Sequence, residues 1–378
     1  MNRMITSAGV CVMLAMGASL AQAQVGANFD PADWDFGPRF DTDGEVPIWN
    51  PVMQKIKNGE PVIGGTIRAT DPRTYCATAS AGYDFTWIEM QHEAMTWEQV
   101  SRMWLSCPRP AVPGVRIPHE SEENIQKPVD SGALVIVVPT VDSVEEAQRA
   151  VNWTYFPPMG RRSNGGGQGF SGTMWGGVPG GYRETWNENV VLILMIETLE
   201  GVQAARDIAK IPGVDGLFAA SGDLGNFSGY RQGDPQYEML ITEVVEAAQE
   251  AGKIACGPLR WMGDRPDFMC FQGGTEAANI RRGGQAEIQA ANQRFADAPA
   301  RPRIAGVLVN LTAEGGEIVY EDDCLDAVRA AVSASEDLTA PEQQGVRTRL
   351  MEIVAAHPSQ AARIREVAAG AGLALGGR

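Results

Sequence analysis

Two acidic side chains follow two consecutive apolar runs near the middle of the chain. Residues 190–196 are followed directly by Glu197. Residues 214–220 are followed by Ser221, Gly222 and then Asp223. The segment between the runs, residues 199–211, has the apolar spacing of an amphipathic helix. Parallel strands joined by a helix end on the same side of their sheet. We therefore expect Glu197 and Asp223 to lie side by side at one edge of a parallel sheet.

Two neighbouring carboxylates repel one another unless a positive charge lies between them. A hard divalent cation with oxygen ligands meets this need most simply, so Glu197 and Asp223 are predicted metal ligands. The alternative is structural: acids are favoured at helix N-termini, and both residues precede or begin a helical segment. The spacing alone leaves both interpretations open.

Other polar residues follow neighbouring apolar runs and are expected at the same edge. Arg116 is near the end of the run 111–117, and His92 follows the run 85–90. A cation and an arginine would stabilise the negative charge of an enolate, and a histidine would move its proton. Each has a structural alternative, since Arg116 could pair with a nearby acid and His92 could be an ordinary loop residue. Further polar residues of this edge are Glu89, Gln91, His119, Glu120 and Ser221.

The residue inventory argues against several other chemistries. The three histidines are His92, His119 and His357, and the last is far along the chain, which disfavours a three-histidine zinc site. None of the five lysines follows an apolar run, which disfavours a Schiff-base mechanism. The nucleophile motif G-x-S-x-G is absent from the sequence. The net charge of −16 argues against nucleic acid and anionic membrane surfaces as partners.

The order of apolar runs and helical segments predicts an α/β fold, a (β/α)8 TIM barrel with a C-terminal helical extension. Continuous apolar runs that alternate with amphipathic segments are typical of parallel strands covered by helices. Eight units over about 210 residues favour a closed barrel over an open sheet, which remains the alternative. The predicted strands are residues 61–67, 85–90, 111–117, 134–139, 190–196, 214–220, 254–256 and 268–272.

The chain divides into four predicted parts. Residues 1–23 have a positive start, an apolar stretch and an A-x-A site, which are typical of a secretory signal peptide. Residues 24–60 form an N-terminal arm with a closing helix, residues 61–297 the barrel with its last helix, and residues 298–378 the helical extension. We therefore expect cleavage near Ala23 and a periplasmic or secreted protein.

Two further features remain open at this stage. Five cysteines remain after signal cleavage, so one disulfide is possible, and Cys256 and Cys270 have the apolar surroundings of core residues. Residues 157–187, with a glycine-rich centre at 163–181, form an unusually long connection. Such a connection is typically a lid, a binding loop or a disordered insert.

Several motifs in order resemble the HpcH/HpaI family of class II aldolases, over about residues 52 to 290. They are DFTWIEMQHE, GVRIPHE, FPPMGRRS, ILMIETLEGV, VDGLFAASGDL and FQGGTEAANIRRG. The resemblance implies a (β/α)8 barrel with a swapped C-terminal helix, assembled as a homo-oligomer (a trimer or hexamer). It implies Mg²⁺, Mn²⁺ or Co²⁺ as cofactor, and pyruvate that is joined to an aldehyde or released from a 2-keto-4-hydroxy acid.

The resemblance also implies roles for individual residues. Glu197 and Asp223 match the metal ligands, His92 the acid/base histidine, and Arg116 the arginine at the pyruvate carbonyl. Three further matches are Ser221 and Gly222 at the pyruvate carboxylate, Asp130 as a residue that reaches the neighbouring protomer's histidine, and Arg162 in the P-P-x-G-x-R element. The chain departs from the family at Thr66, Glu89, Gln91 and Met195, which alters the acceptor side and the surroundings of His92.

Three functions are therefore compared. The first is an exported, metal-dependent carbon–carbon lyase that acts on a 2-keto acid. The second is an enzyme of the citrate-lyase or malyl-CoA-lyase type, which export disfavours because CoA thioesters are not expected outside the cytoplasm. The third is a non-catalytic exported binding or assembly protein on an aldolase-like barrel. The sequence does not identify the aldehyde, the stereochemistry or the preferred metal.

Overall fold

The eight predicted strands form one closed, all-parallel barrel in the order β1 to β8. The computed structural model of the chain describes residues 30, 33, 34, 36, 37, 45–165, 169–297, 329, 332, 333, 338–370 and 372–376. The strands are β1 Val62–Ile67, β2 Phe85–Glu89, β3 Gly114–Arg116, β4 Val135–Val138, β5 Val191–Ile196, β6 Gly216–Ala219, β7 Ile254–Pro258 and β8 Phe268–Thr275. The predicted (β/α)8 barrel is confirmed, and the open sheet is excluded.

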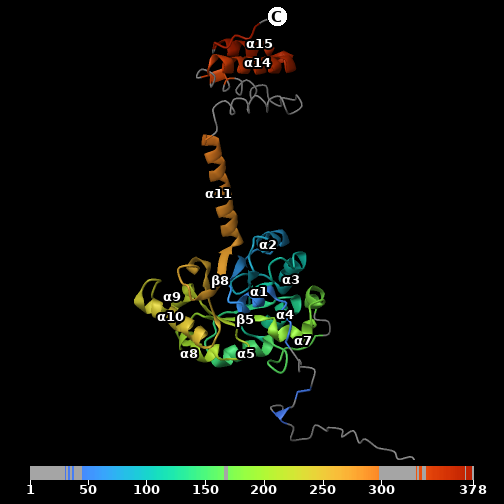
Figure 1. Cartoon of the computed structure of the whole chain (residues 1–378), viewed down its shortest axis with the longest axis vertical. Helices are drawn as coiled ribbons and strands as arrows, with labels where there is room; N and C mark the ends of the chain where they lie inside the picture. Colours follow the sequence, from blue (N-terminus) through green and yellow to red (C-terminus); the bar gives the residue numbers. More distant parts are fainter. Residues whose placement is uncertain are drawn as a thin grey trace, which may run out of the picture. The chain divides into compact units, whose positions relative to one another are not determined.

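Helices surround the strands, as Figure 1 shows. Most of them begin just after a strand ends, so their N-termini lie at the same end of the barrel as the strand C-termini. Side chains of Asp71, Thr96, Ser121, Ser143 and Thr198 cap five of these helices. The barrel helices are α1 Pro51–Lys57, α2 Pro72–Ala79, α3 Trp97–Ser106, α4 Glu122–Ser131, α5 Val144–Thr154, α8 Leu199–Ala209, α9 Ser221–Ser228 and α10 Pro235–Glu250.

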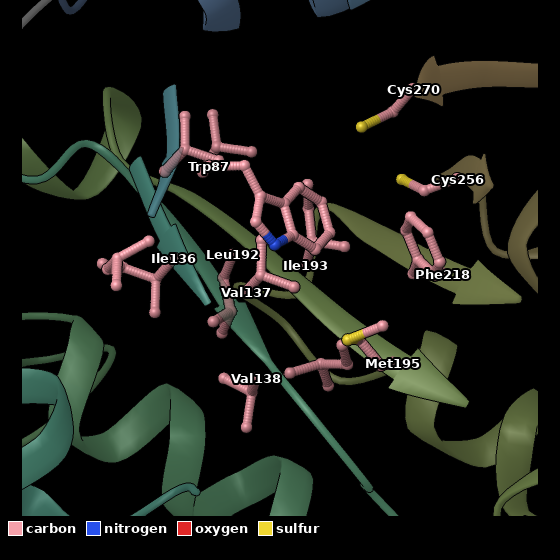
Figure 2. Packing of buried hydrophobic residues seen from close by; sticks show 14 of the residues in the cluster. Trp87, Ile136, Val137, Val138, Leu192, Ile193, Met195, Phe218, Cys256 and Cys270 are labelled. Carbon is pink, nitrogen blue, oxygen red and sulfur yellow. The ribbon is translucent and has the colours of Figure 1, made fainter. Parts of the chain in front are cut away.

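Large side chains fill the inside of the barrel. Figure 2 shows the Trp87 indole among residues of β4, β5 and β6. Trp87 meets Phe218 edge to face, with ring centroids 5.4 Å apart. Cys256 and Cys270, partners in the register of β7 and β8, are buried free thiols, as expected of core residues. The barrel is therefore a packed core rather than a pore, and polar groups collect at its ends.

The long insert lies at the opposite end of the barrel from the strand C-termini. It joins α5 to β5, and its described part contains α6 Gly169–Trp175, α7 Tyr182–Thr185 and the 3₁₀ turn η3 Trp186–Glu188. The Trp175 indole donates to the carbonyl of Gly132, just after α4, and the Trp186 indole donates to the carbonyl of Thr154, at the end of α5. A connection from a helix to a strand lies at the strands' N-terminal end, so this part of the insert is no lid over the strand C-termini.

A disulfide joins two neighbouring helices on the outside of the barrel. It links Cys76 of α2 to Cys107, the residue that ends α3. The sequence left this pairing open. Cys324 lies outside the described residues, as does the first part of the predicted helical extension, residues 298–328.

The contacts within the chain divide it into two compact units, and the boundary in the sequence lies between Glu276 and Ala277. The second unit contains nearly all of α11 Glu276–Asp297, then α14 Ala340–Ala356, η5 Pro358–Gln360 and α15 Ala361–Gly370. Its own apolar cluster includes Leu350, Ile353 and Ile364. Among the described residues, no helix has both the length and the apolar character required to cross a membrane.

Candidate active site

Glu197 is a buried carboxylate with only one of its two oxygens hydrogen-bonded. It directly follows β5 and is 2% exposed. Its Oε1 accepts from the Thr140 backbone N–H at 2.5 Å and from the Thr140 hydroxyl at 2.8 Å. Its Oε2 is also buried, and in the described part of the chain it has no hydrogen-bond partner. Burial raises the pKa of Glu197, the two Thr140 donors lower it, and the nearby Asp223 charge raises it further.

The structure brings Asp223 close to Glu197, as predicted. β5 and β6 are neighbours, with Ile196 in register with Ala219, and Asp223 is the third residue of α9. The structural alternative fails for Glu197, because the Thr198 side chain caps α8 instead. At the start of α9, the N–H groups of the first turn have no acceptor within the helix, so the turn at Ser221 and Gly222 can bind an anion.

Arg116 is held by a buried ion pair with Glu89. The two residues are register partners at the ends of β3 and β2, and Glu89 is completely buried. Glu89 Oε2 accepts from Arg116 Nε at 2.7 Å and also from Nη2. Arg116 Nη1 contacts Met195 Sδ at 3.8 Å, a weak acceptor. The alternative reading of Arg116 as the partner of a nearby acid is therefore correct, but the pair also fixes the guanidinium at the mouth of the barrel.

The second oxygen of Glu89 organises the loop that carries His92. Glu89 Oε1 accepts from the backbone N–H of Gln91 at 2.9 Å and of His92 at 3.2 Å. The Glu89 carboxylate thus holds the His92 backbone, and the His92 side chain is exposed at the mouth. His119 is also exposed, and its Nδ1 lies 3.9 Å from a Glu120 oxygen.

Asp130 is not brought to this end of the barrel. It lies near the C-terminus of α4 and accepts a 2.8 Å hydrogen bond from Arg162. Arg162 is buried among aromatic rings, 4.2 Å from the ring centroid of Trp186 and 4.5 Å from that of Phe156. Within this chain Asp130 therefore belongs to the packing of the insert, and a contact with a neighbouring protomer stays a prediction.

Two residues of the site were not predicted, and a third has a further role. Thr140, after β4, binds Glu197. Glu89 was expected to influence His92, and it holds Arg116 as well. Arg260 follows β7 and donates to Ser221 Oγ at 2.8 Å, which adds positive charge beside the start of α9. Thr140 and Arg260 both had a readable signal, since each follows a predicted apolar run (134–139 and 254–256) as the predicted site residues do.

The donor set fits a divalent cation. The described residues contain no cluster of three or more His, Cys, Asp or Glu side chains suited to a metal. The candidate ligands are the two carboxylates of Glu197 and Asp223. A cation such as Mg²⁺ or Mn²⁺ is commonly bound by one or two carboxylates, with water and substrate oxygens as the remaining ligands. The unpartnered Oε2 of Glu197 is a buried acceptor that such a cation would satisfy.

Fold and site together define a class. The structure is a closed (β/α)8 barrel with two acids, an arginine and a helix N-terminus at its C-terminal mouth, which is where active sites of this fold lie. The model of the HpcH/HpaI aldolase/citrate lyase family matches residues 67–275, so the chain belongs to that family. The protein is thus a class II, metal-dependent aldolase, a carbon–carbon lyase, and the resemblance described above is confirmed.

Known relatives agree with this assignment. The hydroxypyruvate/pyruvate aldolase of Paraburkholderia phytofirmans is 31% identical over 217 residues, which cover 55% of this chain and 82% of the relative. The 2-keto-3-deoxy-L-rhamnonate aldolase of Salmonella gallinarum is 27% identical, covering 54% and 78%. A crystal structure of a family protein from Burkholderia cenocepacia has the same fold, with a TM-score of 0.58 at 24% identity, covering 64% of this chain and 99% of that one.

Removal of one partner of the Glu89–Arg116 pair should strongly destabilise the protein. Glu89→Gln leaves the buried Arg116 without its counter-charge, so the free energy of unfolding should fall by about 3–5 kcal/mol. The matched control is Glu98→Gln, which breaks the exposed pair with Arg102 and should leave stability nearly unchanged. Urea denaturation measures both. Equal effects in the two variants would contradict the role assigned to Glu89.

Proposed function

We propose that the protein is an exported class II aldolase that uses pyruvate as its nucleophilic partner. It joins pyruvate to an aldehyde, or cleaves a 2-keto-4-hydroxy acid into pyruvate and an aldehyde. The single observation that supports this proposal most is the incomplete hydrogen bonding of the buried Glu197 carboxylate. One oxygen of this buried carboxylate is fixed by Thr140, the other has no hydrogen-bond partner among the described residues, and the charge of Asp223 acts on the same carboxylate. A cation at this position would satisfy both acids, and the guanidinium of Arg116 lies close enough to influence the same carboxylate.

The residues of the chain suggest a division of labour. The first-turn N–H groups of α9 would bind the pyruvate carboxylate, assisted by the positive charge of Arg260. Arg116, whose Nε and Nη2 are occupied by Glu89, would use its remaining donors on the pyruvate carbonyl oxygen. A bound divalent cation would supply Lewis-acid stabilisation of the negative charge that develops on that oxygen. The exposed His92 would transfer protons at the mouth of the barrel.

Exchange of the pyruvate C3 protons in D2O tests the proposal without any choice of aldehyde. With Mn²⁺ or Mg²⁺ the wild-type protein should exchange these protons, and EDTA should abolish the exchange. Glu197→Gln should reduce the rate by at least about 100-fold, because it removes a charged metal ligand. Glu200→Gln, an exposed acid three residues further on, is the control and should exchange normally.

The possible outcomes separate the candidate functions. NMR of the C3 methyl signal gives the exchange rate directly. Undiminished exchange in Glu197→Gln would contradict the assigned site. Absence of exchange with Mn²⁺ bound would instead favour the non-catalytic binding protein.

Export is a further part of the proposal. The signal-like residues 1–23 motivate it, and the Cys76–Cys107 disulfide supports it, because stable disulfides are typical of oxidising compartments. Protein isolated from the periplasm or the culture medium should begin near Gln24 and carry this disulfide, while Cys256 and Cys270 remain thiols. N-terminal sequencing and mass spectrometry after alkylation check both points. A mature protein that retains residues 1–23, with Cys76 reduced, would contradict export.

A homo-oligomer is also expected, and α11 supports it. Ile280, Ile288 and Phe295 are 68%, 63% and 65% exposed, and their spacing places them on one side of the helix. Such an apolar stripe is typical of a contact with another copy. Ile280→Asp combined with Ile288→Asp should therefore lower the mass measured by light scattering to that of a monomer. The control Met239→Asp, at an exposed position of α10, should leave the mass unchanged.

A further inference from the structure

Thr140 has an unusual backbone conformation at the centre of the site. Its φ is +48°, and among the described residues it is the one non-glycine residue with a positive φ. A β-branched residue rarely adopts this left-handed conformation, because its side chain crowds the backbone. Such strain persists only where the surroundings enforce it, and it is concentrated at functional sites.

The hydrogen bonds of Thr140 are directed at a single atom. Both its backbone N–H and its hydroxyl donate to Glu197 Oε1, at 2.5 and 2.8 Å. Neither reaches Oε2, which stays buried and unpartnered. Two donors on one oxygen fix the rotation of the carboxylate and present the other oxygen in a constant direction.

The surrounding loops hold Thr140 in place from both sides. The Val141 N–H donates to the carbonyl of Met195 on β5 at 3.1 Å, and the Thr198 hydroxyl donates to the Asp142 side chain. Gly201 allows the close approach of α8, since a Cβ there would lie 2.8 Å from the Val141 carbonyl oxygen. The loop after β4 is thus clamped to the loop after β5 independently of Glu197.

Helix capping does not explain Thr140. The residue that caps α5 is Ser143, whose hydroxyl accepts from the Glu146 N–H at 3.3 Å. The strained residue therefore lies outside the cap, and its side-chain hydrogen bond serves Glu197 alone.

We propose that Thr140 is a positioning residue that locks Glu197 so that Oε1 is occupied and Oε2 is the single oxygen offered to a divalent cation. The inference rests on the proposed function, because it assumes that Glu197 is a metal ligand. It assigns the hydroxyl of Thr140 to metal affinity rather than to the fold. Groups that orient a metal ligand in this way usually change metal affinity 10–100-fold when they are removed.

The test compares Mn²⁺ dissociation constants, measured by electron paramagnetic resonance of free Mn²⁺, for the wild-type protein and four variants. Thr140→Val removes the hydroxyl and should weaken Mn²⁺ binding by about 10-fold or more. Thr140→Gly also removes it but adopts a positive φ without strain, and should weaken binding similarly. Thr140→Ser keeps the hydroxyl and should stay within about 3-fold of the wild type.

Thr154→Val is the matched control. Thr154 is a buried threonine whose hydroxyl donates to the Ala150 carbonyl, at the opposite end of the barrel. Loss of this hydroxyl should change the free energy of unfolding but leave the Mn²⁺ dissociation constant unchanged. Thermal unfolding without metal shows whether each variant is folded.

The outcomes distinguish this inference from the proposed function. Wild-type Mn²⁺ affinity in both Thr140→Val and Thr140→Gly would overturn the role of Thr140 and leave the function standing. If the wild-type protein binds Mn²⁺ but does not exchange pyruvate protons, the proposed function is overturned. Weaker Mn²⁺ binding by Thr140→Val would in that case still support the positioning role of Thr140. Wild-type protein that binds no Mn²⁺ would overturn both.

Discussion

Burial of negative charge at the mouth of the barrel is the constraint on which the site depends. Glu89 ends β2 and Glu197 directly follows β5, at the same end of the closed sheet, and both are almost completely removed from water. An isolated carboxylate is costly in such surroundings unless it gains hydrogen bonds and a positive partner. The two residues meet this requirement differently, and the difference separates structural from chemical roles.

Both oxygens of Glu89 have hydrogen-bond donors within the chain, and its negative charge has a positive partner. Its two oxygens accept from Arg116 and from two backbone N–H groups, so it is a fixed counter-charge that positions a cationic side chain and a loop. Glu197 receives two neutral donors on one oxygen and, from the part of the chain that the structure describes, none on the other. The charge of Asp223 raises the pKa of Glu197, and that of Arg116 lowers it. We therefore propose that the incompletely satisfied acid is the one that binds an external cation.

The barrel and the acid pair could be predicted because each depends on a short-range pattern. Strands β5 and β6 are uninterrupted apolar runs, so the residues that follow them were bound to meet at one end of a parallel sheet. The backbone conformation of Thr140 could not be predicted in this way, because a left-handed backbone at a threonine contradicts local preference and arises from the clamp between two loops. The Glu89–Arg116 pair needed the register of β2 and β3, which the sequence does not contain.

The insert shows how connectivity decides function when composition does not. Its glycines are compatible with a lid, but a segment between α5 and β5 lies at the N-terminal end of the strands, away from Glu197. There, the described part packs two tryptophan indoles against the ends of α4 and α5. Arg162, stacked on the ring of Trp186, takes Asp130 as its partner. The same argument places Thr140, Glu197 and Arg260 together, because each follows a strand rather than a helix. The position of a residue relative to its strand is thus a better guide to chemistry in this fold than its residue type.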